Sequence, residues 1–235
     1  MINRRGRKHR FHAIRTFDLF IGLAGNDRQP GWFHEIAEED PSHEFFQTIY
    51  SFCVVPGGAM GGMDRRVLEV FYGARPVDSV IDLKHQDFAG KPLAIPQPQR
   101  RFITEGGAAL RYTRTARGSV IVTLYPARSE DHRPREDFIV LQHLRDATSL
   151  TGKPRLRKHF RILIAYCECT SLDGAPQAID WVLTFWIRFT KPIVVNGKVT
   201  RRRIVAVLLT ILQWSLTVGF SGALLAVVQG LMKTP

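Results

Sequence analysis

The chain has 235 residues, 45 % of them hydrophobic, and a net charge of +12, which excludes a wholly disordered chain and one too short to bury a core. Its three cysteines exclude a disulfide-stapled secreted fold, because Cys167 and Cys169 are too close in sequence to bond readily to each other. This cysteine usage indicates a reducing compartment.

The basic residues gather in three clusters, at residues 4–15, 153–161 and 198–203. Clustered Lys and Arg side chains are typical of proteins that bind nucleic acid, nucleotide phosphates or anionic lipid headgroups. The second cluster lies far from the C-terminus, so contact with lipid explains it least well. We therefore predict an anion-binding site formed by Lys153, Arg155, Arg157, Lys158 and Arg161.

Two helices are predicted near the N-terminus, at residues 11–24 and 42–52, from apolar residues at three- and four-residue intervals. Ser42 is the expected N-cap of the second helix. Residues 34–44 are rich in His, Asp and Glu, but their spacing does not match H-E-x-x-H. We interpret this stretch as a solvated acidic loop, with pairing to a basic cluster as the alternative.

Four glycines at residues 57–62 resemble a phosphate cradle in outline, but neither the P-loop nor the G-x-G-x-x-G pattern is present. We interpret this segment as a flexible connection, with an anion site helped by Arg65 and Arg66 as the alternative. A helix carrying Val67, Leu68 and Phe71 should follow, and then a second helix at residues 77–85.

A β-rich region is predicted after a proline-containing linker at residues 87–101. Residues 109–115 and 119–125 alternate and are rich in Thr, Tyr and Val, which predicts a β-hairpin, and residues 137–145 predict a third strand. A small antiparallel sheet is the expected result.

Two more helices are expected before residue 200. Helical spacing over residues 155–170 predicts the first. Trp181, Phe185 and Phe189 recur every four residues in the second, which either lies at a membrane interface or packs onto the sheet. Asn196–Gly197 then predicts a tight turn.

The C-terminal segment is predicted to cross a membrane. Residues 204–232 contain no charged side chain, and a helix of that length reaches about 43 Å, enough for a whole bilayer. Basic residues precede it, so the N-terminal domain should be cytoplasmic and the C-terminus outside. Arg201, Arg202, Arg203 and Trp181 are the expected interface residues. Small residues share one face of the span and predict self-association there: Gly219, Gly222, Ala226 and Gly230.

We thus expect an α+β cytoplasmic domain, with a basic tail and helical region at residues 1–90 and a β-hairpin and helix region at residues 91–199, followed by a single transmembrane helix at residues 200–235. The favoured function is a membrane-anchored, homo-oligomeric sensor or effector that binds nucleic acid or a nucleotide, as in bacterial antiviral defence systems that perturb membranes. A passive scaffold or accessory subunit and a membrane-bound hydrolase are the alternatives. No spacing identifies catalytic residues, a metal site or a cofactor, and His159 with Cys167 and Cys169 lacks zinc-site spacing.

Overall fold

The computed structural model describes residues 4–58, 65–86, 92–200 and 213, and this part of the chain has an α+β fold with antiparallel sheets, as the sequence predicts. The helices are α1 (Arg4–Ala24), α2 (Trp32–Glu38), α3 (Pro41–Ile49), the 3₁₀ turn η1 (Thr148–Leu150), α4 (Lys153–Thr170) and α5 (Ala178–Thr190). The strands are β1 (Gly25–Asn26), β2 (Gln29–Pro30), β3 (Phe52–Pro56), β4 (Val67–Tyr72), β5 (Ala74–Gln86), β6 (Pro92–Gly106), β7 (Ala109–Arg114), β8 (Val120–Tyr125), β9 (Arg128–Ser129), β10 (Phe138–Leu144), β11 (Ile193–Val195) and β12 (Lys198–Thr200).

A seven-stranded antiparallel sheet forms the centre of the fold, in the order β12-β11-β10-β8-β7-β4-β3. Its strands come from both sides of residue 90, so the sheet is larger than the predicted three strands. Alternation places Leu110 and Tyr112 of β7 in the core, while Arg111 points to the other face.

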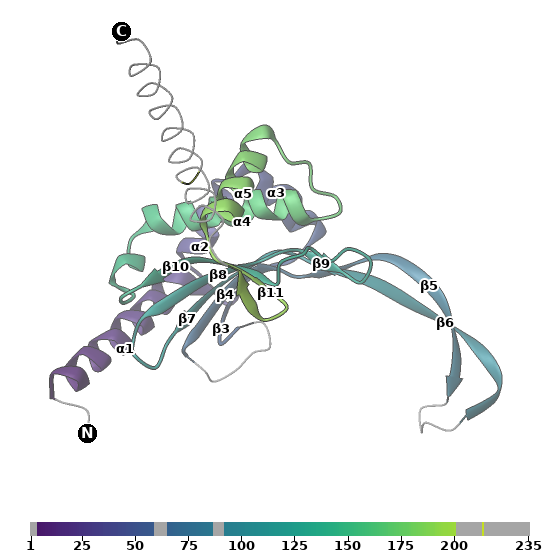
Figure 1. Ribbon diagram of the computed structural model, residues 1–235, viewed down its shortest axis with the longest axis horizontal. Coiled ribbons are helices and arrows are strands. Elements are labelled where there is room, and N and C mark those ends of the chain that lie inside the picture. The colour runs from purple at the N-terminus through teal and green to yellow at the C-terminus, as the bar shows by residue number, and fades with distance from the viewer. Residues whose placement is uncertain (1–3, 59–64, 87–91, 201–212, 214–235) are drawn as a thin grey trace, which may run out of the picture.

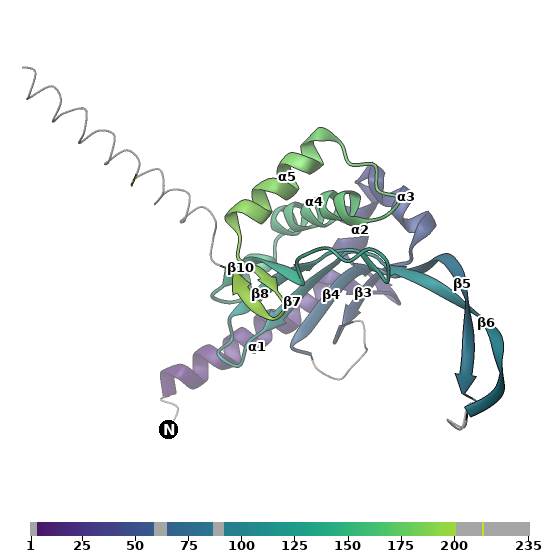
Figure 2. The ribbon, with the colours of Figure 1, turned by 45° about the vertical axis from the view of Figure 1, so that its right-hand side comes forward.

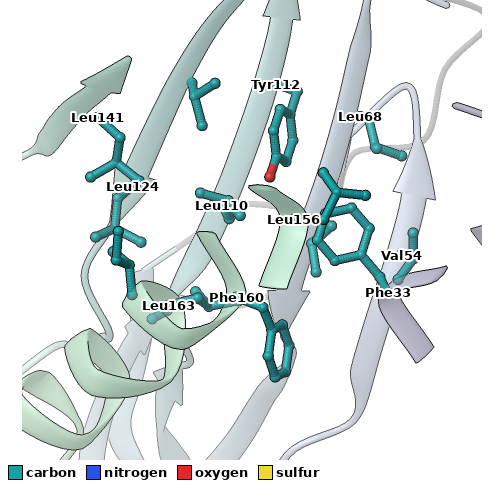
Figure 3. Packing of buried hydrophobic residues seen from close by; sticks show 14 of the residues in the cluster. Phe33, Val54, Leu68, Leu110, Tyr112, Leu124, Leu141, Leu156, Phe160 and Leu163 are labelled. Atoms are coloured by element: carbon teal, nitrogen blue, oxygen red, sulfur yellow. The ribbon is translucent and has the colours of Figure 1, made fainter. Parts of the chain in front are cut away.

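The core lies between this sheet and the helices on one of its faces. Leu68, Leu110 and Leu124 of the sheet are buried in one cluster with Leu156, Phe160 and Leu163 of α4, as Figure 3 shows. The Tyr112 ring lies 5.1 Å from the ring of Phe20 in α1 and 6.0 Å from that of Phe33 in α2.

The helices form two layers above the sheet. Figures 1 and 2 place α4 directly over the sheet and α5 on the outer side of α4. On the other side of the molecule, β5 and β6 form a long two-stranded ribbon, which we call the arm, that leaves the sheet and curves away from α5 (Figure 2).

Several predicted elements are confirmed. Helices occur at α1, α3, α4 and α5, strands β7, β8 and β10 match the predicted hairpin and third strand, and Asn196–Gly197 makes the tight turn between β11 and β12. Both turn residues have left-handed backbones, with φ of 51° at Asn196 and 71° at Gly197, which suits a two-residue hairpin turn.

The two helices predicted between residues 67 and 85 are wrong, because both segments are strands. Leu68, Val70 and Tyr72 alternate into the core, and β4 pairs with β3 and β7. Residues 77–85 belong to β5, which pairs with β6, so the predicted proline-containing linker is largely a strand too. In both segments, pairing with neighbouring strands outweighs an apolar spacing that would also fit a helix.

Two further details of the N-terminal region differ from expectation. Residues 34–44 lie mainly in α2 and α3 instead of a loop. The N-cap of α3 is Asp40, whose Oδ1 accepts a hydrogen bond from the Ser42 amide at 3.1 Å, so Ser42 is already inside the helix. Asp40 takes this role because Pro41, with its fixed φ and no amide hydrogen, suits the first helical position.

Among the described residues, no helix is long and apolar enough to cross a membrane. The predicted transmembrane segment lies outside the described residues, apart from Thr200 in β12 and Gln213.

Candidate functional site: the outer face of helix α5

Helix α5 carries its large apolar side chains on the outside and its polar ones on the inside. Asp180 is 5 % exposed and Thr184 is 1 % exposed. By contrast, five large side chains of the same helix are between 54 % and 68 % exposed: Ile179, Trp181, Val182, Phe185 and Trp186. This pattern is the reverse of an ordinary surface helix, whose apolar stripe faces the core.

Specific polar contacts hold α5 in this orientation. Thr184 Oγ1 donates to the carbonyl oxygen of Ala165 in α4 at 3.4 Å, and Asp180 Oδ1 accepts from Arg161 Nη2 at 3.4 Å. At the start of the helix, Asp180 Oδ2 accepts a hydrogen bond from the backbone N–H of Gln177 at 3.0 Å. Ile187 is buried beside these groups, so the inward side is satisfied and the apolar side is left open.

The exposed stripe is continuous along the helix. At 100° per residue, the positions from Trp181 through Phe185 and Phe189 to Trp186 cover about 140° of the helix circumference. The Phe185 and Phe189 rings stack at 5.9 Å. Helix α5 packs mainly on α4 and also contacts β10 of the sheet, but in both contacts the aromatic stripe points outward. The predicted packing of these aromatic residues onto the sheet is therefore not observed. A contiguous apolar patch of this kind marks an interaction surface.

A cavity of about 470 Å³ lies beside α5, which is within the range of small-ligand sites. Its wall comes from α5, from the end of α4, from the loop before β10 and from β11 and β12. The indole of Trp181 belongs both to this wall and to the exposed stripe. Four basic side chains line the cavity: His132, Arg135, Arg188 and Lys191.

One of these cations is already compensated inside the protein. Glu136 Oε1 accepts hydrogen bonds from Arg188 Nε and from the Tyr166 hydroxyl, both at 2.7 Å. Desolvation opposes ionisation of Glu136, but the Tyr166 hydrogen bond and the Arg188 charge outweigh it, so the pKa of Glu136 is lowered. Arg188 therefore serves to fix α5 to the loop before β10.

The remaining cations make the cavity basic. Within the described part of the chain, Arg135 and Lys191 form no ion pair, and His132 lies beside them. A cavity with two free cations and a half-exposed indole suits a phosphate-bearing ligand, because Lys and Arg bind phosphate oxygens and an indole can stack on a base or lie among headgroups.

The predicted anion-binding cluster lies on α4, and three of its five members are paired with carboxylates. Lys153 bonds to Glu35, Arg157 Nη2 lies 2.8 Å from Glu39, and Arg161 contacts both Asp40 and Asp180. The acidic stretch at residues 34–44 thus pairs with this basic cluster, which was the alternative reading of that stretch. Arg155 and Lys158 form no ion pair within the described ranges, and anion binding at the cluster stays a prediction.

The other sequence-derived candidates fall into two groups. Arg201, Arg202 and Arg203 and the small-residue face at Gly219, Gly222, Ala226 and Gly230 lie outside the described residues. His159 is buried, and its Nδ1 lies 2.9 Å from the Tyr112 hydroxyl. Burial raises the pKa of the Cys167 thiol to about 12, and no group of three metal-ligating side chains occurs among the described residues.

The cavity residues Arg135 and Lys191 were not identified from the sequence. Glu136 and Arg188 are 52 positions apart, so no local spacing connects them. No protein family, no curated protein and no solved structure matches this chain.

Proposed function

We propose that this protein is a membrane-bound recognition protein whose folded domain lies on an anionic bilayer through the outer face of α5. The observation that carries this proposal is the reversed polarity of α5, with Asp180 and Thr184 buried and the aromatic residues outside. An amphipathic helix with Trp and Phe on its outer face is typical of helices that lie in the headgroup region.

A lipid surface fits this helix better than a protein groove for two reasons. The uncharged apolar stretch at residues 204–232 follows α5 closely in the sequence, which brings α5 near any bilayer that the stretch enters. The positions between them include Lys191, Lys198 and the arginines at 201–203, and basic residues next to a membrane are attracted to anionic headgroups by about 1 kcal/mol each.

The basic cavity supplies the recognition part of the proposal. Because Trp181 belongs both to the cavity wall and to the α5 stripe, a helix lying on the bilayer places the cavity at the level of the headgroups. The ligand class is a phosphate-bearing molecule, either a phospholipid headgroup or a nucleotide. This cavity is the site that we assign to the anionic partner of a membrane-anchored sensor or effector.

The chain cut after Thr200 tests this proposal, since it keeps every described helix and strand and the whole described core. We expect the truncated protein to float with vesicles of mixed neutral and anionic lipid. Replacing Trp181 and Phe185 with Glu should weaken vesicle binding by roughly 100-fold or more, because each large apolar side chain contributes about 1.5–3 kcal/mol when it leaves water.

The matched control replaces Leu19 in α1 and Phe45 in α3 with Glu, because both side chains are also exposed. Circular dichroism and a thermal melt establish that each variant is folded. Equal vesicle binding by the truncated protein and its Trp181→Glu/Phe185→Glu variant, with both folded, would overturn the proposal.

A further inference from the structure

The arm formed by β5 and β6 is a second surface that the fold leaves uncovered. Its strands pair antiparallel from Ala74 opposite Gly106 to Gln86 opposite Pro92, with register shifts between Pro76 and Asp78 and between Lys84 and Gln86. Among the described residues, β6 meets a third strand only at the base, where Glu105 pairs with Ser129 and Gly106 with Arg128 of β9. Both views show the arm reaching away from the sheet and from α5 (Figures 1 and 2).

The base of the arm is tightly fixed. Glu105 is 1 % exposed and accepts hydrogen bonds from the Tyr50 hydroxyl at 2.6 Å, Arg75 Nη2 at 2.9 Å and the Leu172 amide at 2.7 Å. These contacts join both arm strands to the end of α3 and to the loop before α5. The arm therefore leaves the body in a defined direction.

Three large apolar side chains lie on one face of the arm. In the arm, Ile81 lies opposite Arg100 and Ser79 lies opposite Phe102. Directly opposite residues share a face, and so do alternate residues of one strand, so Ile81, Leu83 and Phe102 lie on the same face. Ile81 is 70 % exposed, Leu83 is 59 % exposed and Phe102 is 57 % exposed. A two-stranded ribbon has no second layer with which to cover them, and such a ribbon alone is marginally stable in water.

The outer edge of β5 offers backbone groups for another strand. Among the described residues β6 is the only strand that pairs with β5, so the opposite edge of β5 is free from Ala74 to Gln86. A long exposed edge with apolar side chains is a template for pairing with another chain.

The charges of the arm favour a protein partner over a polyanion. Arg101 is paired with Asp82 at 2.8 Å and also with Glu130, and Arg75 is paired with Glu105 at 2.9 Å. The cations at these positions are therefore already compensated. Arg100 lies 5.5 Å from the Phe102 ring centre and donates to Ser79.

We propose that the arm joins two copies of this chain by antiparallel pairing of β5 with β5 of a second copy, with Ile81 on the two-fold axis. An axis at Val80 would place Asp78 opposite Asp82, and an axis at Asp82 would place that residue opposite its own copy. Like charges directly opposite each other destabilise an antiparallel pair.

An axis at Ile81 avoids both repulsions. It brings the most exposed apolar side chain of the arm onto its own copy, and it sets Leu83 opposite Ser79 of the second chain. The apolar faces of the two arms then form one surface across four strands. Such an isologous contact needs no other protein and closes at two copies.

Cysteine crosslinking of the full chain tests this register. The variants carry Cys53→Ser and Cys169→Ser, which remove the two half-exposed thiols and leave the buried Cys167. With Ile81→Cys we expect rapid formation of a covalent dimer on oxidation, because directly opposite residues have Cα atoms about 4.5–5.5 Å apart, within reach of a disulfide.

Leu83→Cys is the matched control, since it lies on the same face and is similarly exposed. Its two copies would lie roughly 14 Å apart, four residues along the strands, and should form dimer at least about tenfold more slowly because a disulfide does not span that distance. A mixture of Leu83→Cys and Ser79→Cys chains should crosslink to each other. Absence of the Ile81→Cys dimer, or equal rates for Ile81→Cys and Leu83→Cys, would overturn the proposal.

Discussion

Asp180 and Trp181 are consecutive residues of α5, yet the carboxylate is buried against Arg161 and the indole is more than half exposed. This relationship fixes the rotation of the helix about its own axis. Because Thr184 and Arg188 follow Asp180 on the inner side, the aromatic residues have no place in the core. An exposed apolar face of this size marks a surface that contacts a membrane or a partner.

Charge reversal in the cavity should weaken vesicle binding selectively. Replacing Arg135 and Lys191 with Glu removes two cations that have no ion pair in the described part of the chain. We expect weaker binding to anionic vesicles, by at least about 2 kcal/mol at low salt, since each basic residue near the surface contributes about 1 kcal/mol. Vesicle flotation of the chain cut after Thr200, at rising salt concentrations, measures this loss.

The control for the cavity reverses two exposed cations elsewhere on the domain, Arg117→Glu with Arg145→Glu, so that the change in net charge is the same. Titration with a soluble nucleotide distinguishes the two phosphate sources, because a nucleotide site would bind it without vesicles. If the Arg135→Glu/Lys191→Glu variant binds both vesicles and nucleotide like the parent protein, the cavity is not the anion site.

The basic cluster on α4 gives a separate prediction for nucleic acid. If the cluster binds a polyanion, its unpaired members carry the contact, so Arg155→Glu with Lys158→Glu should weaken binding and reduce its salt dependence. Arg157→Glu instead opposes the exposed Glu39 and should lower stability by about 1 kcal/mol or less. A filter-binding assay on the full chain together with thermal melts separates these effects. No binding by the parent protein would remove the cluster as a nucleic-acid site.

His159 should make the fold sensitive to acid. Its pKa is lowered to about 4, first by burial and then by the positive charges of Arg155, Lys158 and Lys191. The unfolded chain binds a proton at this residue near pH 6.5, whereas the folded chain resists it, so stability falls as the pH drops from about 6.5 to 4, by about 3 kcal/mol. The His159→Gln variant should lose this part of the pH dependence in denaturant melts. An unchanged profile would contradict the buried, neutral imidazole.

Loss of the Glu136 carboxylate should loosen α5. Glu136→Gln leaves Arg188 without its counter-charge, and we expect a cost of about 1–3 kcal/mol, typical of a disrupted buried hydrogen-bonding partner. The lowered pKa of Glu136 means that its stabilisation is present above pH 4.5 and is lost as the pH falls further. Hydrogen exchange should therefore speed up in α5 of the variant and leave β7 unaffected. Equal exchange in both proteins would show that this pair does not hold the helix.

Periodicity in the sequence was enough to predict α1, α4 and the β7–β8 hairpin, because their apolar residues repeat with a clear period. It failed for β4 and β5. Val67, Leu68 and Phe71 also fit a helix, and the pairing partners of β4 lie in β3 and β7, beyond any local window. The full width of the sheet depended on the same long-range pairing.

For α5, the sequence showed two faces but not which one points inward. Trp181 and Phe185 repeat every four residues, and so do Asp180, Thr184 and Arg188. Ordinary amphipathicity would bury the aromatic set. The observed orientation follows from partners distant in sequence, namely Glu136, Arg161 and the Ala165 carbonyl.

The most direct test of the proposed membrane contact is the depth of α5 in the bilayer. Spin labels are placed at Val182 and at Phe185 of the full chain, in which Cys53 and Cys169 are replaced by Ser. Each label reports how often it collides with oxygen, which concentrates in lipid, and with a nickel chelate, which stays in water. In vesicles containing anionic lipid we predict high oxygen and low nickel accessibility at both positions, and the reverse at Phe45, an exposed control on α3. High nickel accessibility at Val182 and Phe185, equal to that at Phe45, would contradict the account.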